Sequence, residues 1–130
     1  MTEMNILYVE DDPRLRRHVL HDLLKVSHDV IEACDGTQAC WLLNYHKSDL
    51  DLLITDINLG GELDGWTVAE HARMIWRDIG VIYATGTTLD HPLLQNSIAL
   101  TKPFSSQALE NAIAMVSTAS DNSAREAISP

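Results

Sequence analysis

The sequence predicts an α/β domain built on a parallel sheet, and three observations lead to that prediction. Short apolar runs alternate along the chain with longer segments of helical periodicity. This alternation is typical of parallel strands joined by right-handed helical crossovers. The chain has 130 residues, which is one domain's worth, and 45% of them are apolar. Polar residues follow several of the apolar runs, and ligands of such sheets bind where the strands end.

The first half of the chain is expected to hold three strands and two helices. The strands are expected at residues 5–9, 28–33 and 50–55, each short, apolar and β-prone. Asp12 and Pro13 form an N-cap and a first helical position, and leucine and valine then recur at helical spacing. Asp35 opens the second helix in the same way.

The second half is expected to complete the sheet. A third helix is expected over residues 63–76, followed by strands at residues 80–84 and 98–101. Ser105 is placed as the N-cap of a last helix. Residues 1–117 are therefore predicted to form one domain, and the polar residues 118–130 a disordered tail.

Composition excludes several classes of function. Nine basic and nineteen acidic residues give a net charge of −10, which argues against binding to nucleic acid or to an anionic membrane. Cys34 and Cys40 lack the spacing of a zinc site and are expected to be reduced thiols. No signal peptide or membrane span is evident, and a cytoplasmic location is expected.

Five polar residues at four of the predicted strand ends carry the chemistry. Glu10 and Asp11 follow the first strand, Asp56 the third, Thr85 the fourth and Lys102 the fifth. Three carboxylates in one cleft repel each other unless a cation lies among them. Hard oxygen ligands in this number suit Mg²⁺, which also shares its shell with phosphate oxygens.

These residues have complementary roles in phosphoryl transfer. A carboxylate such as Asp56 can attack a phosphoryl group and form an acyl phosphate. Lys102 can pair with a phosphoryl oxygen, and Thr85 can donate its hydroxyl to another. Asn58 lies two residues beyond Asp56, where its backbone carbonyl could complete the metal shell.

Five separated motifs resemble the receiver domain of two-component response regulators. They occur in the family's order over roughly residues 4–117: Val9-Glu10-Asp11-Asp12, Leu53-Ile54-Thr55-Asp56-Ile57-Asn58, Asp64-Gly65, Tyr83-Ala84-Thr85-Gly86 and Thr101-Lys102-Pro103-Phe104. Each motif is weak alone, but the set is specific.

The resemblance implies a fold and a function. The fold is the flavodoxin-like, CheY-like doubly wound sheet of five parallel strands in order 2-1-3-4-5. Asp56 would be the phosphoacceptor, Glu10 and Asp11 would bind Mg²⁺, Asn58 would add its carbonyl, and Thr85 and Lys102 would bind the phosphoryl group.

The resemblance also implies a cis peptide bond between Lys102 and Pro103. The donor would be a sensor histidine kinase or a histidine phosphotransfer protein. The output would be binding to an unknown downstream protein, or transfer of the phosphoryl group onward in a phosphorelay.

Three departures from the family pattern concern how the signal is read out. The position three residues before Lys102, usually aromatic, is Ala99. Only sixteen residues separate Thr85 from Lys102, so a short or irregular fourth helix is expected, with one turn at most around Pro92 to Asn96. The loop after Asp56 is one residue longer than the common form and contains Gly60 and Gly61.

Alternatives stay open at this point. Glu10 and Asp11 could simply be an acidic cluster at a helix start, and Lys102 a surface lysine. An Mg²⁺-dependent phosphohydrolase would normally have a second aspartate where this chain has Asn58. A degenerate receiver would act only by binding proteins, and the chain could also be the N-terminal receiver of a larger regulator. The main hypothesis is a phosphoacceptor, not an enzyme, that assists only its own phosphorylation and dephosphorylation.

Overall fold

Five parallel strands form one sheet in the order β2-β1-β3-β4-β5. The computed structural model describes residues 3–46, 49–87, 89 and 91–116. The predicted fold class and strand order are therefore confirmed. The strand bounds are β1 (Asn5–Val9), β2 (Asp29–Ala33), β3 (Leu52–Asp56), β4 (Gly80–Thr85) and β5 (Ser97–Thr101).

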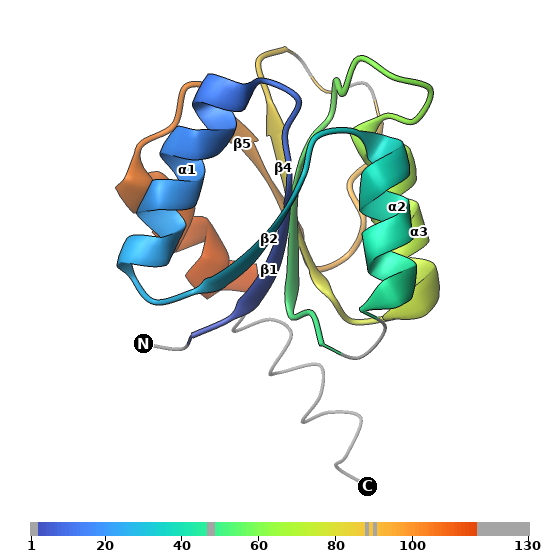
Figure 1. The fold of residues 1–130 in the computed structure, drawn as a ribbon, viewed down its shortest axis with the longest axis horizontal. Helices are drawn as coiled ribbons and strands as arrows, with labels where there is room; N and C mark the ends of the chain where they lie inside the picture. The colour runs from blue at the N-terminus through green and yellow to red at the C-terminus, as the bar shows by residue number, and fades with distance from the viewer. Residues whose placement is uncertain (1–2, 47–48, 88, 90, 117–130) are drawn as a thin grey trace, which may run out of the picture.

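Helices cover both faces of this sheet (Figure 1). They are α1 (Pro13–Lys25), α2 (Gly36–Tyr45) and α3 (Gly65–Ile75), and residues 106–116 form a last helix. The last helix and α1 lie on one face, while α2 and α3 lie side by side on the other. Within the part of the chain that the structure describes, no helix has the length and apolarity needed to cross a bilayer.

Side-chain caps fix where the helices begin. Asp12 accepts a hydrogen bond from the backbone N–H of Arg14 at 3.0 Å, and Asp35 accepts one from Gln38 at 2.7 Å. The hydroxyl of Ser105 accepts from the N–H of Ala108 at 3.0 Å. Each cap satisfies a donor that has no partner within its helix. The predicted caps at Asp12, Asp35 and Ser105 are confirmed.

Two apolar clusters, one on each face, hold the layers together. Leu7, Leu53 and Val81 point from the central strands toward α2 and α3. Ile6, Ile54 and Ile82 point to the opposite face and pack with residues of α1 and the last helix. Because the central strands are buried on both faces, they carry apolar side chains at successive positions.

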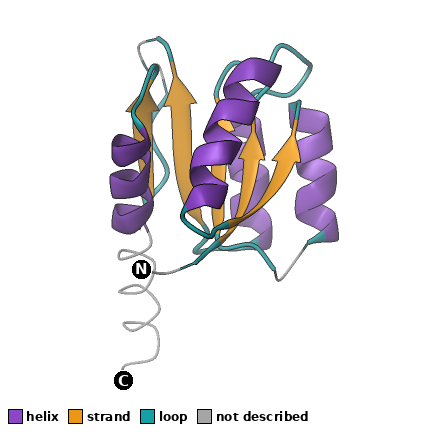
Figure 2. Cartoon of the chain, turned by 60° about the vertical axis from the view of Figure 1, so that its left-hand side comes forward, coloured by secondary structure: helices purple, strands orange, loops and turns teal. Residues whose placement is uncertain are grey.

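The parallel arrangement brings the carboxyl ends of the strands to one edge of the sheet (Figure 2). Val9 pairs in register with Thr55, and Thr85 pairs with Thr101. Glu10 and Lys102, which directly follow these strands, therefore lie at the same edge as Asp56, the last residue of β3. The functional residues are brought together by topology, although they are up to 92 positions apart in the sequence.

The chain between β4 and β5 is irregular. Among its described residues, 86–87, 89 and 91–96, none is helical. The irregular course agrees with the prediction, but the single helical turn considered around Pro92 to Asn96 is not formed. The guanidinium of Arg73 in α3 donates to the carbonyls of Ile79 at 2.8 Å, Asn96 at 3.0 Å and Gln95. These side-chain bonds hold the segment to α3 without a helix of its own.

The predicted disordered tail at residues 118–130 lies outside the described residues. The expected cis bond between Lys102 and Pro103 is present.

Candidate functional site

Three carboxylates meet where β1 and β3 end. One carboxylate oxygen from each of Glu10, Asp11 and Asp56 lies within 4.8 Å of the others. Glu10 is 1% exposed and Asp56 is 6% exposed, while Asp11 faces solvent. Two buried carboxylates this close to a third need positive charge to compensate them.

Lys102 supplies part of that positive charge. Its Nζ lies 2.8 Å from Glu10 Oε1 and 2.9 Å from Asp56 Oδ2. Burial alone would lower the pKa of Lys102, but its hydrogen bonds to Glu10 and Asp56 outweigh burial and raise that pKa. The ammonium therefore stays charged and bridges the two buried acids.

Burial raises the pKa of Glu10 from 4.5 to about 7. The bond from Lys102 and a 3.2 Å bond from the backbone N–H of Asp12 act in the opposite direction. Nearby Tyr8 also has a raised pKa, first because it is buried and then because of the charge of Glu10. One cation among three acids leaves the cluster with excess negative charge, which fits a divalent cation with oxygen ligands.

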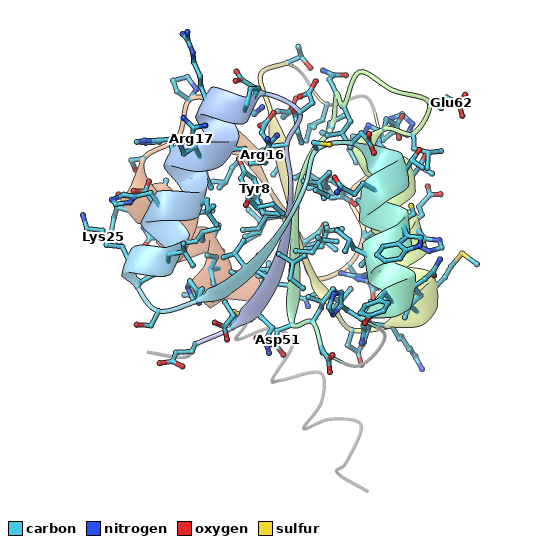
Figure 3. The ribbon with its side chains drawn as sticks, viewed as in Figure 1. Tyr8, Arg16, Arg17, Lys25, Asp51 and Glu62 are labelled. Carbon is cyan, nitrogen blue, oxygen red and sulfur yellow. The ribbon has the colours of Figure 1, made fainter. Side chains whose placement is uncertain are left out.

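Arg16 of α1 binds the backbone at the end of β1, next to the acidic cluster. Its Nη1 donates to the backbone carbonyl of Glu10 at 2.7 Å, and its Nε lies 3.4 Å from Glu32 Oε1. Figure 3 shows Arg16 of α1 and Tyr8 of β1 in the space between α1 and the sheet, with Asp51 at the opposite end of the sheet. Arg16 thus fixes the backbone that carries Glu10. The sequence does not predict this contact, since nothing in the spacing of Arg16 indicates its target.

Glycines let the loop between β3 and α3 pack against the acids. A Cβ on Gly65 would collide with the backbone carbonyl of Asp56, so α3 can begin this close to the site only with glycine. Gly60 has a φ of +67°, and a Cβ there would lie 3.2 Å from Asp11 Oδ2. Glu62 lies at the outer part of this loop, away from the cluster (Figure 3).

Thr85 and Asn58 border a cavity of about 180 Å³ next to the acids. The N–H of Asn58 donates to Asp56 Oδ1 at 3.3 Å. The Oγ1 of Thr85 accepts from the N–H of Thr87 at 3.1 Å and also lies 3.3 Å from the Thr87 hydroxyl. Thr87 therefore holds the Thr85 hydroxyl, a contact that the sequence did not predict.

Trp66 lines the same cavity between two other rings. Its ring centroid lies 4.7 Å from that of Tyr83 and 4.6 Å from that of His91. Of the candidate residues, Glu10, Asp11, Asp56 and Lys102 form one cluster, with Asn58 and Thr85 beside it.

A family model matches most of this chain. The response regulator receiver domain model covers residues 6–114. The transcriptional regulatory protein YrkP of Bacillus subtilis is 32% identical over 109 residues, which is 80% of this chain. That alignment spans 45% of YrkP, so this chain covers about half of that relative's length.

Solved structures give the same result for the fold. A response regulator receiver protein from Sinorhizobium medicae has a TM-score of 0.81 at 27% identity, covering 91% of this chain and 97% of its own. The receiver domain of the hybrid histidine kinase CckA has a TM-score of 0.77 at 26% identity, covering 87% of this chain and 98% of its own. Both comparisons extend over nearly the whole of the similar structure.

Proposed function

The chain belongs to the response regulator receiver domain family and is a phosphoacceptor domain, and we propose that Asp56 is the residue that takes the phosphoryl group. The observation that carries this proposal is the position of Asp56. It ends β3, its Oδ2 lies 2.9 Å from Lys102 Nζ, and it shares a cleft with two further carboxylates. No other aspartate among the described residues belongs to such a cluster, apart from its partner Asp11.

We propose that Mg²⁺ binds among Glu10, Asp11 and Asp56, with the backbone carbonyl of Asn58 as a further ligand. The donor set supports this, since carboxylate and carbonyl oxygens are the ligands Mg²⁺ prefers. When bound, the ion would neutralise charge that develops on the transferred group. The buried Glu10 and Asp56 side chains provide fixed oxygens for it, and the exposed Asp11 provides one at the rim.

The transfer step then uses residues of this chain. A carboxylate oxygen of Asp56 forms a bond to phosphorus as the phosphorus–nitrogen bond of a phosphohistidine breaks. The departing imidazole nitrogen keeps the electron pair and takes a proton from solvent. Lys102 pairs with one phosphoryl oxygen, and Thr85 donates its hydroxyl to another after releasing Thr87. The chain assists only its own phosphorylation and dephosphorylation.

The proposed donor is a sensor histidine kinase or a histidine phosphotransfer protein, and the proposed output is binding to a downstream protein or onward phosphorelay. A cytoplasmic location is proposed as well, supported by the free and exposed thiol of Cys34. The alternative is that this sequence is the receiver part of a longer regulator. YrkP, which aligns with this chain over 45% of its own length, is an example of a longer protein that contains a similar segment.

Phosphorylation by a small donor tests the assignment of Asp56. Wild type incubated with acetyl phosphate and Mg²⁺ is expected to gain one phosphoryl group by intact-mass spectrometry, and Asp56→Asn is expected to gain none. Asp49→Asn, which changes an exposed aspartate away from the cluster, is the matched control and should be phosphorylated like wild type. Equal phosphorylation of Asp56→Asn and wild type would refute the assignment.

A further inference from the structure

The peptide bond between Glu10 and Asp11 joins two of the proposed Mg²⁺ ligands. The buried Glu10 and the exposed Asp11 each place a carboxylate oxygen within 4.8 Å of the other. The backbone N–H of Glu10 donates to the carbonyl of Ala33 in β2 at 3.0 Å, which fixes the end of β1 to the sheet. The orientation of the next peptide decides where the Asp11 side chain begins, so a group that holds this peptide also sets the shape of the metal site.

Arg16 of α1 holds this peptide by its carbonyl oxygen. Its Nη1 donates to the Glu10 carbonyl at 2.7 Å, and the charge of the guanidinium strengthens that bond. The backbone of Arg16 is placed by the same loop, since its N–H donates to the carbonyl of Asp12 at 2.9 Å. The N–H of Asp12 in turn donates to Glu10 Oε2 at 3.2 Å. Residues 10–12 and the start of α1 therefore form a closed set of hydrogen bonds that includes the Glu10–Asp11 peptide.

Glu32 fixes the direction of the Arg16 side chain. Its Oε1 lies 3.4 Å from Arg16 Nε. Glu32 pairs in register with Tyr8, which packs on the α1 side of the sheet, so the Glu32 side chain projects to that side as well. The donors of a guanidinium point in fixed directions within one plane, so acceptors at Nε and Nη1 together set the orientation of the group. The Glu32 side chain is 43% exposed, so the ion pair adds little stability and acts mainly on this orientation.

We propose that Arg16, oriented by Glu32, is a positioning residue for the Mg²⁺ site. It holds the Glu10–Asp11 peptide in the orientation in which both carboxylates can reach one ion. The inference rests on the proposed binding of Mg²⁺ by these two acids. It adds two residues that act through the backbone of the site and not as ligands.

The positive charge of Arg16 would act on the site in the opposite direction. Burial raises the pKa of Tyr8, and the charges of Glu10 and Asp56 raise it further. The charge of Arg16 acts on the same group in the opposite sense, so this charge is felt close to the acids (Figure 3). A cation so near repels Mg²⁺, and removal of the charge alone would tighten binding. Positioning predicts weaker binding, so the sign of the change separates the two roles.

Titration of the isotope-labelled, metal-free protein with MgCl₂, followed by NMR, tests the proposal. Arg16→Met should weaken Mg²⁺ binding about tenfold, the low end of the effect of losing a group that orients a ligand. Arg16→Lys keeps the charge but loses the planar donors, so it should also weaken binding. In both variants the amide signal of Asp11, which belongs to the held peptide, should shift before Mg²⁺ is added. Should Arg16→Met fail to fold, as judged by circular dichroism, Arg16→Lys carries the same test.

Glu32→Gln tests the orienting role separately. The substitution should weaken Mg²⁺ binding, but less than Arg16→Met does, because the bond from Arg16 to the carbonyl can still form. In an Arg16→Met background it should have no further effect, since no guanidinium is left to orient. A long-range effect of the Glu32 charge would be equal in both backgrounds, and that result would overturn the role given to Glu32.

Arg17→Met is the matched control, because it removes the same charge from the next, exposed position of α1. It should bind Mg²⁺ at least as tightly as wild type. The inference is overturned if Arg17→Met and Arg16→Met weaken binding equally. It is also overturned, with the metal site left standing, if wild type binds Mg²⁺ and Arg16→Met binds it as tightly or more tightly. If wild type itself binds no Mg²⁺, the proposed metal site fails and this inference fails with it.

Discussion

Thr87 holds the hydroxyl of Thr85: its backbone N–H donates to Thr85 Oγ1 over 3.1 Å, and the two hydroxyl oxygens lie 3.3 Å apart. For Thr85 to donate to a phosphoryl group on Asp56, this arrangement has to break. Thr87 belongs to the irregular segment that leads to β5. The release of Thr85 would therefore free one end of that segment when Asp56 is phosphorylated.

Thr87→Ala is expected to favour the activated arrangement. The substitution removes the contact between the two hydroxyls. It keeps both backbone bonds, the one from the Thr87 N–H at 3.1 Å and the one that the Thr85 hydroxyl donates to the Thr87 carbonyl at 3.3 Å. The release of Thr85 therefore becomes easier by about 0.5–1.4 kcal/mol. The affinity for beryllofluoride in the presence of Mg²⁺, measured by fluorescence titration, should rise about two- to tenfold. In a Thr85→Ala background the same substitution should have no effect, because no hydroxyl is left to release. An equal effect in both backgrounds would contradict this account of Thr87.

Lys102→Met is expected to destabilise the metal-free protein. The variant leaves the buried Glu10 and Asp56 without their shared cation, and loss of one partner from such a group typically costs about 3 kcal/mol. Urea unfolding in the presence of a chelator measures the loss. Mg²⁺ should restore more stability to the variant than it adds to wild type, since the ion takes over the role of the ammonium. Lys25→Met, at an exposed lysine in the last turn of α1, is the control and should change stability little.

Stability of the metal-free protein should fall as pH rises toward neutrality. Burial raises the pKa of Glu10 from 4.5 to about 7, so the folded state holds a proton that the unfolded state has already lost. The contribution of protonated Glu10 is full below pH 4.5 and is lost as pH rises through 7. Glu10→Gln should flatten this part of the profile of unfolding free energy against pH. If wild type and Glu10→Gln have the same slope, Glu10 does not carry the shift.

The affinity for Mg²⁺ should change with pH in the opposite direction. The ion competes with the proton for the Glu10 carboxylate, so binding should tighten as pH rises through about 7. Isothermal titration of the unphosphorylated protein with Mg²⁺ at several pH values measures this.

Adjacent glycines in the loop after β3 should respond differently to alanine. Gly60 has a positive φ and lies against Asp11, so Gly60→Ala adds about 1–2 kcal/mol of backbone strain and pushes on a proposed metal ligand. It should lower both the unfolding free energy and the affinity for Mg²⁺. A Cβ on Gly61 meets nothing within 4 Å, so Gly61→Ala serves as the control. Equal loss of Mg²⁺ affinity in both variants would show that the loop acts through its general flexibility.

Much of the fold followed from local patterns. Asp12 and Asp35 could be predicted as helix N-caps from the sequence, because each side chain accepts a hydrogen bond from a backbone N–H only two or three residues away. The closeness of Glu10, Asp56 and Lys102 in space could be predicted from the sequence, because parallel strands bring their carboxyl ends to the same edge of the sheet. These predictions needed no knowledge of side-chain conformations.

The contacts that were missed depend on tertiary structure. Arg16 reaches the carbonyl of Glu10 through a long side chain whose target is set by how α1 packs on the sheet. The one turn considered near Pro92 was wrong: Asn96 has a left-handed backbone, with a φ of 54°, and the carbonyls of Gln95 and Asn96 are held from outside by Arg73 of α3. No local sequence pattern predicts that the guanidinium of Arg73, on another helix, binds these carbonyls.

The register between β4 and β5 shows which side chain lies next to the small residue Ala99. Ala99 lies directly opposite Tyr83, whose buried ring packs against Trp66. Neighbouring side chains on parallel strands share one face, so the space left by alanine borders an aromatic residue contributed by the next strand. At this pair of positions the aromatic side chain, Tyr83, is on the interior strand β4, and the small side chain, Ala99, is on the edge strand β5. Because Ala99 is only partly buried, a tyrosine introduced at position 99 would lie beside the ring of Tyr83 with part of its surface open to solvent.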